Sequence, residues 1–271
     1  MNHKYGLIGY PLGHSYSPRI HQAIFQSTDF LGEYSLFEIA GDKIPKFFHN
    51  LKQGGLEGFN VTIPYKQTVI PYMDDLSPEA QRIGAVNTVR ITSGGLKGYN
   101  TDYIGFKALL LESCGNVFNK NVLILGDGGS ARTVYTCMCD LGVSTCYMVS
   151  RKADRIKASF PEACVVPYEA AYDLKDLYLT VNCTPVGMFP HVDAAPLDIE
   201  RMDPFPYYVD LIYNPARTLM MENVEKAGGK AINGLYMLIS QAVAAQEIWR
   251  QEQIHRDITK KVQLMIERSV I

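Results

Sequence analysis

A continuous apolar run at residues 122–125 leads directly into the glycine-rich segment Gly126-Asp127-Gly128-Gly129-Ser130-Ala131. A strand pattern without polar positions is typical of a parallel sheet that is covered on both faces. The residues after the glycines are helix-compatible to about Leu141, and a second strand pattern follows at residues 145–149. The sequence therefore predicts a strand–helix–strand unit of the kind that repeats into an open parallel sheet.

The same alternation extends along the whole chain. In the second half we expect further strands at residues 164–166, 179–181, 208–212 and 230–232, followed by a helical segment from residue 235 to the end. In the first half we expect strands at residues 5–9, 33–39 and 59–64, a helix at 43–53, and a hairpin formed by 86–91 and 96–99. Helices are also expected after Ser17-Pro18 and Ser77-Pro78, because Ser suits the N-cap and Pro the first helical position. Strands and helices in turn indicate an α/β protein with largely parallel pairing, and 271 residues are enough for two domains.

The glycine segment matches the G-x-G-x-x-G/A pattern of dinucleotide-binding turns. Gly126 permits the tight turn, Gly128 lets the backbone approach a pyrophosphate, and Ala131 allows close packing of the helix on the strand. The helix N-terminus offers free N–H groups and a partial positive charge to the phosphates. We therefore predict a dinucleotide site, with a plain glycine turn as the alternative. The Asp127 carboxylate lies beside the expected phosphate position.

The residues that follow the next strand favour NADP over NAD. NAD enzymes tend to place Asp or Glu about 20 residues after the glycines, where it binds the ribose hydroxyl. Here the strand ends at Ser150 and is followed by Arg151, Lys152 and, one helical turn after Arg151, Arg155. A guanidinium stacks on adenine and pairs with a 2′-phosphate. The alternative is a solvated basic loop.

Three polar clusters in the first half are candidates for a second site. Ser15 and Ser17 stand at the start of an expected helix, where Ser17 alone is best explained as an N-cap. Asn60 and Thr62 fall on one face of an expected strand. Asn87-Thr88 belongs to a third group, which continues at Asn100-Thr101-Asp102.

A lysine and an aspartate in these clusters form a possible acid/base pair. Lys66 is expected at the start of a helix, where a cation opposes the helix dipole, although a surface lysine explains it equally well. Asp102 is equally well explained as the N-cap of the following helix. If both faced one substrate hydroxyl, they could exchange a proton with it.

Charge and composition exclude several functions. The chain has 26 Lys and Arg against 28 Asp and Glu and no long like-charge run, so we expect no nucleic-acid partner. No apolar stretch approaches the roughly 18 residues that span a bilayer. Its six cysteines form no C-x-x-C pair and have no histidines at zinc spacing, so we expect reduced thiols, a cytoplasmic protein and no metal site.

The motifs together resemble those of the shikimate dehydrogenases, in the same order and spacing from residue 5 to about 250. In the first half these are Ser15-x-Ser17-Pro18, Asn60-Val61-Thr62-x-Pro64-x-Lys66, Gly84-Ala85-Val86-Asn87-Thr88 and Gly98-x-Asn100-Thr101-Asp102. In the second half they are Gly126-x-Gly128-Gly129, Ser150-Arg151 to Arg155, Asn182-x-Thr184-Pro185-Val186-Gly187-Met188, Asp210-Leu211-Ile212-Tyr213-Asn214-Pro215 and Asn233-Gly234-Leu235-x-Met237-Leu238-x-x-Gln241-Ala242.

This resemblance implies an NADP-dependent oxidoreductase that reversibly reduces 3-dehydroshikimate to shikimate in the biosynthesis of chorismate and aromatic amino acids. It implies an α/β substrate domain at residues 1–101 and 235–271, to which the C-terminal helices return, and a Rossmann-like, doubly wound NADP domain at 102–234. Lys66 and Asp102 would be catalytic. The substrate would be bound by Ser15, Ser17, Asn60, Thr62, Asn87, Tyr213 and Gln241. NADP would be bound by Gly126, Asp127, Gly128, Gly129, Ser130, Ala131, Ser150, Arg151, Lys152, Arg155, Thr184, Met188, Ile212, Gly234 and Met237.

Some alternatives remain open at this point. Asp127, Cys183 and Tyr236 depart from the residues usual in the family, which bears on cofactor affinity and on the space near the nicotinamide. The same fold could act on quinate, or on quinate and shikimate, with NAD or NADP; a folate-linked methylene dehydrogenase has a similar build but other motifs. A non-catalytic sensor of shikimate or dinucleotide would not need both Lys66 and Asp102. The protein could be a monomer or a homodimer.

Overall fold

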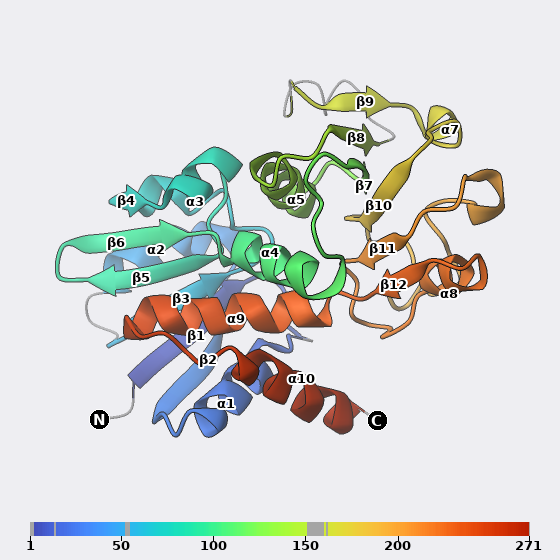
Figure 1. Ribbon diagram of the computed structural model, residues 1–271. Helices are drawn as coiled ribbons and strands as arrows, with labels where there is room; N and C mark the ends of the chain where they lie inside the picture. Colours follow the sequence, from blue (N-terminus) through green and yellow to red (C-terminus); the bar gives the residue numbers. More distant parts are fainter. Residues whose placement is uncertain (1–2, 14, 52–54, 151–159, 161, 271) are drawn as a thin grey trace. The chain divides into compact units, whose positions relative to one another are not determined.

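The computed structural model describes residues 3–13, 15–51, 55–150, 160 and 162–270. The chain divides into two compact units, Met1–Gly105 with Leu238–Ile271, and Phe106–Met237 (Figure 1). The divisions fall inside two helices, α4 (Thr101–Ser113) and α9 (Leu235–Arg250). Asp102, on the first turn of α4, therefore belongs to the first unit. Within the part of the chain that the structure describes, no helix is long and apolar enough to cross a membrane.

The first unit contains a six-stranded mixed sheet in the order β2-β1-β3-β5-β6-β4. Its strands are β1 (His3–Gly9), β2 (Gly32–Glu38), β3 (Gly58–Val61), β4 (Asp75–Leu76), β5 (Thr88–Thr92) and β6 (Gly95–Tyr99). The first three pair in parallel, as the sequence predicts. The predicted hairpin is present as β5 and β6, and β5 also pairs with β3 in the antiparallel sense. The two-residue strand β4 is too short to leave a sequence pattern.

Helices from both ends of the chain cover this sheet. They are α1 (Ser17–Ser27), α2 (Ile44–Asn50) after the 3₁₀ turn Gly41–Lys43, α3 (Pro78–Ile83) after the 3₁₀ turn Ile70–Tyr72, and the C-terminal α9 and α10 (Asp257–Val270). Figure 1 shows α9 lying across the strands. Near its end, the Trp249 ring stacks on Tyr5 of β1 at 4.6 Å and donates a hydrogen bond to the Val89 carbonyl of β5 at 2.9 Å. The C-terminal helices thus return to the first unit, as the family resemblance implies.

The second unit is a six-stranded, entirely parallel sheet in the order β12-β11-β10-β7-β8-β9. Its strands are β7 (Asn121–Leu125), β8 (Thr145–Val149), β9 (Cys164–Val166), β10 (Leu177–Asn182), β11 (Tyr207–Asp210) and β12 (Lys230–Ile232). The helical segments are α5 (Gly129–Asp140), α7 (Tyr168–Ala171), the 3₁₀ turn Ile199–Arg201 and α8 (Leu219–Lys226). All the strands predicted here are present, although β11 ends at Asp210 instead of Ile212.

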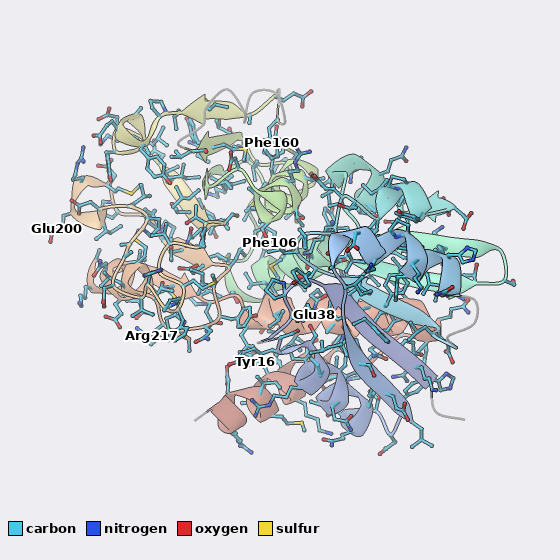
Figure 2. The ribbon with its side chains drawn as sticks, turned by 180° about the vertical axis from the view of Figure 1, so that it is seen from behind. Tyr16, Glu38, Phe106, Phe160, Glu200 and Arg217 are labelled. Carbon is cyan, nitrogen blue, oxygen red and sulfur yellow. The ribbon has the colours of Figure 1, made fainter. Side chains whose placement is uncertain are left out.

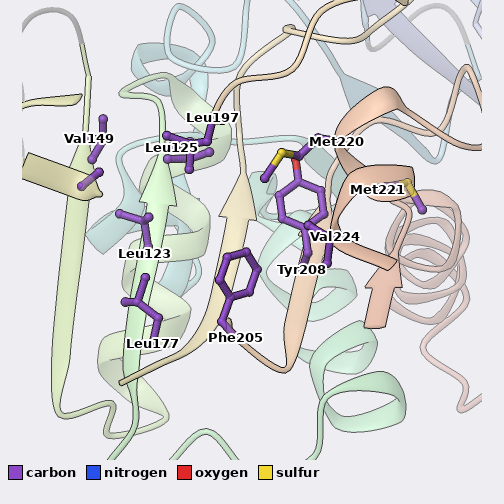
Figure 3. Packing of buried hydrophobic residues seen from close by; sticks show 11 residues of the cluster. Leu123, Leu125, Val149, Leu177, Leu197, Phe205, Tyr208, Met220, Met221 and Val224 are labelled. Carbon is purple, nitrogen blue, oxygen red and sulfur yellow. The ribbon is translucent and has the colours of Figure 1, made fainter. Parts of the chain in front are cut away.

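Apolar side chains from this sheet and α8 form the core of the second unit (Figure 3). Leu123 and Leu125 of β7 and Tyr208 of β11 are fully buried beside Met220 and Val224 of α8. Burial of apolar surface of this kind is the main stabilising contribution to a fold. The apolar run at residues 122–125 is therefore a central strand of a parallel sheet, and the glycine turn follows its carboxyl end.

Candidate active site

Lys66 lies in a series of turns after β3, not in a helix, so the predicted helix start is wrong. The Lys66 carbonyl accepts a hydrogen bond from the Val86 backbone N–H at 2.8 Å, whereas the Ile70 N–H, its partner in a helix, donates to Gln67. The contact fixes the Lys66 backbone against the segment that enters β5.

Asp102 lies in the first turn of α4 but does not cap it, so the alternative explanation of Asp102 as an N-cap is also wrong. The cap is Asn100, whose Oδ1 accepts a hydrogen bond from the Tyr103 N–H at 3.1 Å, while its Nδ2 donates to the Ala85 carbonyl at 3.0 Å. The Asp102 carboxylate is thus available for another partner. A negative charge in the first turn of a helix is also favoured by the helix dipole.

The partner of Asp102 is the Lys66 ammonium, whose Nζ lies 2.6 Å from Oδ2 of the carboxylate. The side chains remain 29% and 19% exposed, so the pair is shielded from bulk water yet accessible to a ligand. Two groups that the sequence analysis could only propose as neighbours are therefore in direct contact. An amine that is held in place by a carboxylate and can be reached by a ligand is suited to exchange a proton with a substrate oxygen.

Ser15 and Ser17 lie where α1 begins, but the prediction of Ser17 as its N-cap is wrong. Ser17 is the first helical residue and Tyr16 is the N-cap, without a side-chain capping bond. Ser15 instead makes the local contact, because its Oγ accepts the Ser17 backbone N–H at 3.3 Å. The Ser17 hydroxyl bonds to Tyr34 of β2. The loop before Ser15 is held by Glu38, whose carboxylate accepts the Leu12 N–H at 2.8 Å; Glu38 and Tyr16 are labelled in Figure 2.

A chain of buried polar side chains links three of the predicted substrate residues. Asn60 donates from Nδ2 to Oγ1 of Thr88 at 2.9 Å, and the Thr88 and Thr101 hydroxyls lie 2.9 Å apart. Asn87 accepts the Thr101 N–H at 2.6 Å, and the Thr101 hydroxyl donates to Gln241 at 3.4 Å. All five residues are buried. Since Thr101 immediately precedes Asp102, the chain ends beside the Lys66–Asp102 pair.

Thr62 and Tyr213 are the remaining predicted substrate residues. The strand that contains Asn60 ends at Val61, so Thr62 follows the strand instead of continuing it. Its N–H still donates to the Ile8 carbonyl of β1 at 2.9 Å, which keeps it beside the sheet. Tyr213 is half-buried and follows β11 in the second unit.

In the second unit, the glycine turn has the geometry that the sequence predicts. Gly126 follows β7 with a φ of +109°, a conformation that favours glycine, and its N–H donates to the Val149 carbonyl of β8 at 2.8 Å. Gly128 is the N-cap of α5, with no side-chain capping bond. Apart from the adjoining backbone, no atom of the described residues lies within 4 Å of the position that a Cβ on Gly128 or Gly129 would occupy. The amides at the start of α5 are thus approachable by a large anion.

A cavity of about 390 Å³ opens at this turn. It lies at the carboxyl ends of β7, β8 and β10, which is where ligands bind in parallel sheets of this type. Its walls include Gly126, Asp127, Gly128, Ser150, Cys183 and Thr184. Thr184 is held in place by Asn182, whose Oδ1 accepts the Thr184 N–H at 3.0 Å and its hydroxyl at 2.6 Å. Burial raises the pKa of the Cys183 thiol, so this wall of the cavity is neutral.

Comparisons with known proteins identify the family of this chain. The family model for the substrate-binding domain of shikimate dehydrogenase matches residues 7–89. A shikimate dehydrogenase (NADP(+)) of Clostridium beijerinckii is 38% identical over 98% of both chains. The chain belongs to the shikimate dehydrogenase family.

Solved structures of the family have the same fold over nearly the full length. A chorismate mutase/shikimate 5-dehydrogenase fusion protein of Clostridium acetobutylicum is 39% identical, with a TM-score of 0.96 over 99% of this chain and 98% of that one. Shikimate 5-dehydrogenase of Thermus thermophilus, in complex with NADP(H) and shikimate, is 31% identical, with a TM-score of 0.87 over 97% of this chain and 99% of that one.

The other cofactor residues that the family resemblance implies are spread over the second unit. Ala131 is fully buried in α5 beneath the glycine turn, and Ser130 and Gly129 belong to the first turn of that helix. Ile212 is buried, whereas Met188 is 45% exposed. Met237 is half-buried in α9. Arg151, Lys152 and Arg155 lie outside the described residues, so the preference for a 2′-phosphate stays a prediction.

Gly234 connects β12 to α9 and is required there for a steric reason. A Cβ on this residue would collide with the Leu211 carbonyl oxygen, and its N–H donates to the Ile212 carbonyl at 3.0 Å. Gly234 is therefore packed closely against the backbone of Leu211 and Ile212. No group of three or more His, Cys, Asp or Glu side chains in the described ranges could hold a metal ion.

The buried carboxylate of Asp210 belongs to the family motif Asp210 to Pro215, but the sequence predicts no role for it. It accepts hydrogen bonds from the side chains of Asn182 at 3.1 Å, Tyr208 at 3.2 Å and Thr218 at 2.8 Å, and from the Ile212 N–H at 3.1 Å. These hydrogen bonds lower the pKa of Asp210, but burial raises it by more, so its pKa lies above the ordinary value. The carboxylate joins the ends of β10 and β11 to the start of α8, beside Thr184.

Proposed function

We propose that the protein catalyses the NADP-dependent, reversible reduction of 3-dehydroshikimate to shikimate, a step in the biosynthesis of chorismate and aromatic amino acids. The observation that carries the proposal is the 2.6 Å contact between Lys66 Nζ and Asp102 Oδ2, in a chain of this family. A protein that only binds its ligand gains nothing from a positioned proton donor. The first unit would bind the substrate and the second unit the cofactor.

NADPH, when bound, supplies the hydride for the C3 carbonyl carbon, and the protein supplies position and electrostatics. The Lys66 ammonium donates a proton to the carbonyl oxygen. Asp102 orients the ammonium and stabilises its charge. In the direction of oxidation, the neutral Lys66 amine accepts the proton of the C3 hydroxyl and becomes the ammonium that the Asp102 carboxylate stabilises.

Neutral polar side chains suit a substrate with one carboxylate and several hydroxyls, because each hydroxyl both donates and accepts. Ser15, Ser17 and Thr62 present hydroxyls at the ends of β3 and α1, and Asn60, Asn87 and Gln241 are held in one hydrogen-bonded chain with Thr88 and Thr101. We assign the binding of the substrate carboxylate and hydroxyls to seven residues: Ser15, Ser17, Asn60, Thr62, Asn87, Tyr213 and Gln241.

The residues at the glycine turn fit a dinucleotide. The space beside Gly128 and Gly129 and the uncapped start of α5 suit the pyrophosphate, and Ser150 and Thr184 line the adjacent cavity. We propose Gly126 to Ala131, Ser150, Thr184, Met188, Ile212, Gly234 and Met237 as contacts of NADP, with Arg151, Lys152 and Arg155 at the 2′-phosphate. All six cysteines are free thiols, which fits the expected cytoplasmic location.

The proposal is tested by mixing the purified protein with shikimate and NADP⁺ and following the absorbance of reduced nicotinamide. We expect turnover with this pair, and much lower kcat/KM when quinate replaces shikimate or NAD⁺ replaces NADP⁺. Equal kcat/KM for quinate would make the protein a quinate/shikimate dehydrogenase. Binding of shikimate or NADP⁺ without any reduction of nicotinamide would identify a sensor and overturn the proposal.

A further inference from the structure

Tyr34 joins two of the proposed substrate residues, although it belongs to none of the family motifs. Its hydroxyl donates to Oδ1 of Asn60 at 2.7 Å and is hydrogen-bonded to the Ser17 side chain. The strand register explains how residues 17, 34 and 60 meet. In the sheet, Tyr34 pairs with Tyr5 of β1 and Asn60 pairs with Leu7. Because Tyr5 and Leu7 point to the same face of β1, Tyr34 and Asn60 share that face, and the long tyrosine side chain spans the strand between them.

The Tyr34 ring is fixed by its neighbours on this face. It stacks on the His21 ring of α1, with centroids 3.9 Å apart and planes 10° from parallel. His21 is itself held by Gln246 of α9, whose Nε2 lies 2.9 Å from Nδ1 of the imidazole. A ring that is held from α1 and α9 leaves the hydroxyl little freedom, so the position of its oxygen is set by packing. Burial raises the pKa of Tyr34, which keeps the hydroxyl proton in place as a donor.

The Tyr34 hydroxyl and the Asn87 carbonyl together set the orientation of the Asn60 amide. Since the proton is donated to Oδ1, the amide nitrogen points the other way, to the Thr88 hydroxyl at 2.9 Å and the Asn87 carbonyl at 3.2 Å. The same hydroxyl oxygen is then available to Ser17. Loss of the hydroxyl would remove the 2.7 Å donor of a buried amide oxygen, which also has a hydrogen bond to His21, and would remove the Tyr34 partner of the Ser17 side chain.

We propose that Tyr34 is a positioning residue for the substrate: its hydroxyl fixes the Asn60 amide and the Ser17 hydroxyl, and thereby sets the affinity for shikimate. The inference rests on the proposed function of these two side chains. The bonds of Tyr34 reach the substrate-binding residues and not Lys66 or Asp102. Its removal is therefore expected to change KM for shikimate and to leave kcat nearly unchanged.

The test is the steady-state kinetics of Tyr34→Phe, which removes one oxygen and keeps the ring. We expect KM for shikimate to rise about 5- to 150-fold, the range that corresponds to leaving one buried polar group unsatisfied. We expect kcat and KM for NADP⁺ to change less than about threefold. Tyr5→Phe is the matched control, because its ring also packs on Trp249 and its hydroxyl bonds only weakly, to Glu57 at 3.4 Å; we expect wild-type kinetics from it.

A binding measurement and a double variant complete the test. Trp249 is the single tryptophan and its ring lies 6.4 Å from Tyr34, so its fluorescence can report shikimate binding without cofactor. The dissociation constant of Tyr34→Phe is expected to rise with KM. If Tyr34 acts through Ser17, the effects of Ser17→Ala and Tyr34→Phe on KM are less than additive in the double variant. If Tyr34→Phe does not fold, Ser17→Ala alone still tests the inference. An unchanged KM for shikimate in Ser17→Ala overturns it.

The outcomes separate this inference from the proposed function. A wild-type protein that neither turns over nor binds shikimate refutes the proposed function itself. An active wild type with an unchanged KM in Tyr34→Phe refutes only the positioning role. A loss of kcat, or an equal rise of KM for shikimate and NADP⁺ together with a lower melting temperature, also refutes it, since either result indicates catalysis or general structural damage.

Discussion

Replacement of Lys66 by methionine tests the proposed proton donor directly. Methionine keeps an unbranched apolar side chain and removes the ammonium that lies 2.6 Å from Asp102. Loss of a positioned acid/base group typically lowers the rate about 10²- to 10⁴-fold, which is about 2.7 to 5.5 kcal/mol in the activation free energy. We expect kcat to fall by at least the lower value, while KM for shikimate stays within a few-fold of the wild type.

The effect on stability is expected to be much smaller. Both side chains are partly exposed, so water screens their attraction, and ion pairs of this kind contribute no more than about 1 kcal/mol to the free energy of unfolding. The carboxylate that remains in Lys66→Met is still favoured by the N-terminus of α4. A purely structural ion pair would give the opposite pattern, with stability affected and turnover preserved.

The assay is the initial rate at saturating shikimate and NADP⁺, together with urea unfolding of each variant. Lys97→Met is the matched control, because Lys97 also lies 2.6 Å from a carboxylate, that of Asp75, in the same unit. We expect wild-type kcat from it. Because Lys66 and Asp102 are proposed to act as a unit, Lys66→Met with Asp102→Asn is expected to be little worse than Lys66→Met alone. A kcat of Lys66→Met within about threefold of the wild type would refute the reasoning.

Two further predictions concern stability and the glycine turn. Burial lowers the pKa of His21 to about 3 from an ordinary 6.5, so below pH 6.5 the unfolded chain binds a proton that the native protein does not. The free energy of unfolding then falls with decreasing pH, by up to about 1.4 kcal/mol per pH unit down to pH 3; urea titrations of His21→Phe are expected to show a shallower pH dependence, and an equal slope contradicts the assignment. Gly126→Ala, where a Cβ would meet Thr184 at 3.1 Å and the backbone has a φ of +109°, is expected to lose about 1–3 kcal/mol of stability. Gly128→Ala meets nothing within 4 Å and has an extended backbone, so we expect unchanged stability with a raised KM for NADP⁺; an unchanged KM would contradict a pyrophosphate at this position.

The parts of the fold that sequence alone predicts are those in which one local pattern admits one structure. The run at 122–125 has no polar residue, a pattern typical of a strand buried on both faces, and it is β7, one of the two central strands of its sheet. The glycine turn is equally well determined, since Gly126 adopts a conformation that other residues avoid. The contact between Lys66 and Asp102 was a hypothesis drawn from chemistry, because 36 residues separate them and no local pattern connects them.

The two Ser-Pro pairs show why local patterns fail where function is concerned. Both predict an N-cap followed by a helix, and at Ser77 the prediction is confirmed, since its Oγ accepts the Ala80 N–H at 3.2 Å. At Ser17 it is wrong, because the helix begins at Ser17 itself with Tyr16 as the N-cap, and the Ser17 hydroxyl is hydrogen-bonded to Tyr34. The tyrosine reaches that hydroxyl only because β2 pairs with β1 in one particular register, which no segment of the sequence encodes by itself. A serine that makes a tertiary hydrogen bond and does not cap its helix remains available to a ligand. The same holds for Asp102, because Asn100 caps α4 in its place. In this protein, the residues that depart from the local rule are therefore those for which a role in binding or catalysis is proposed.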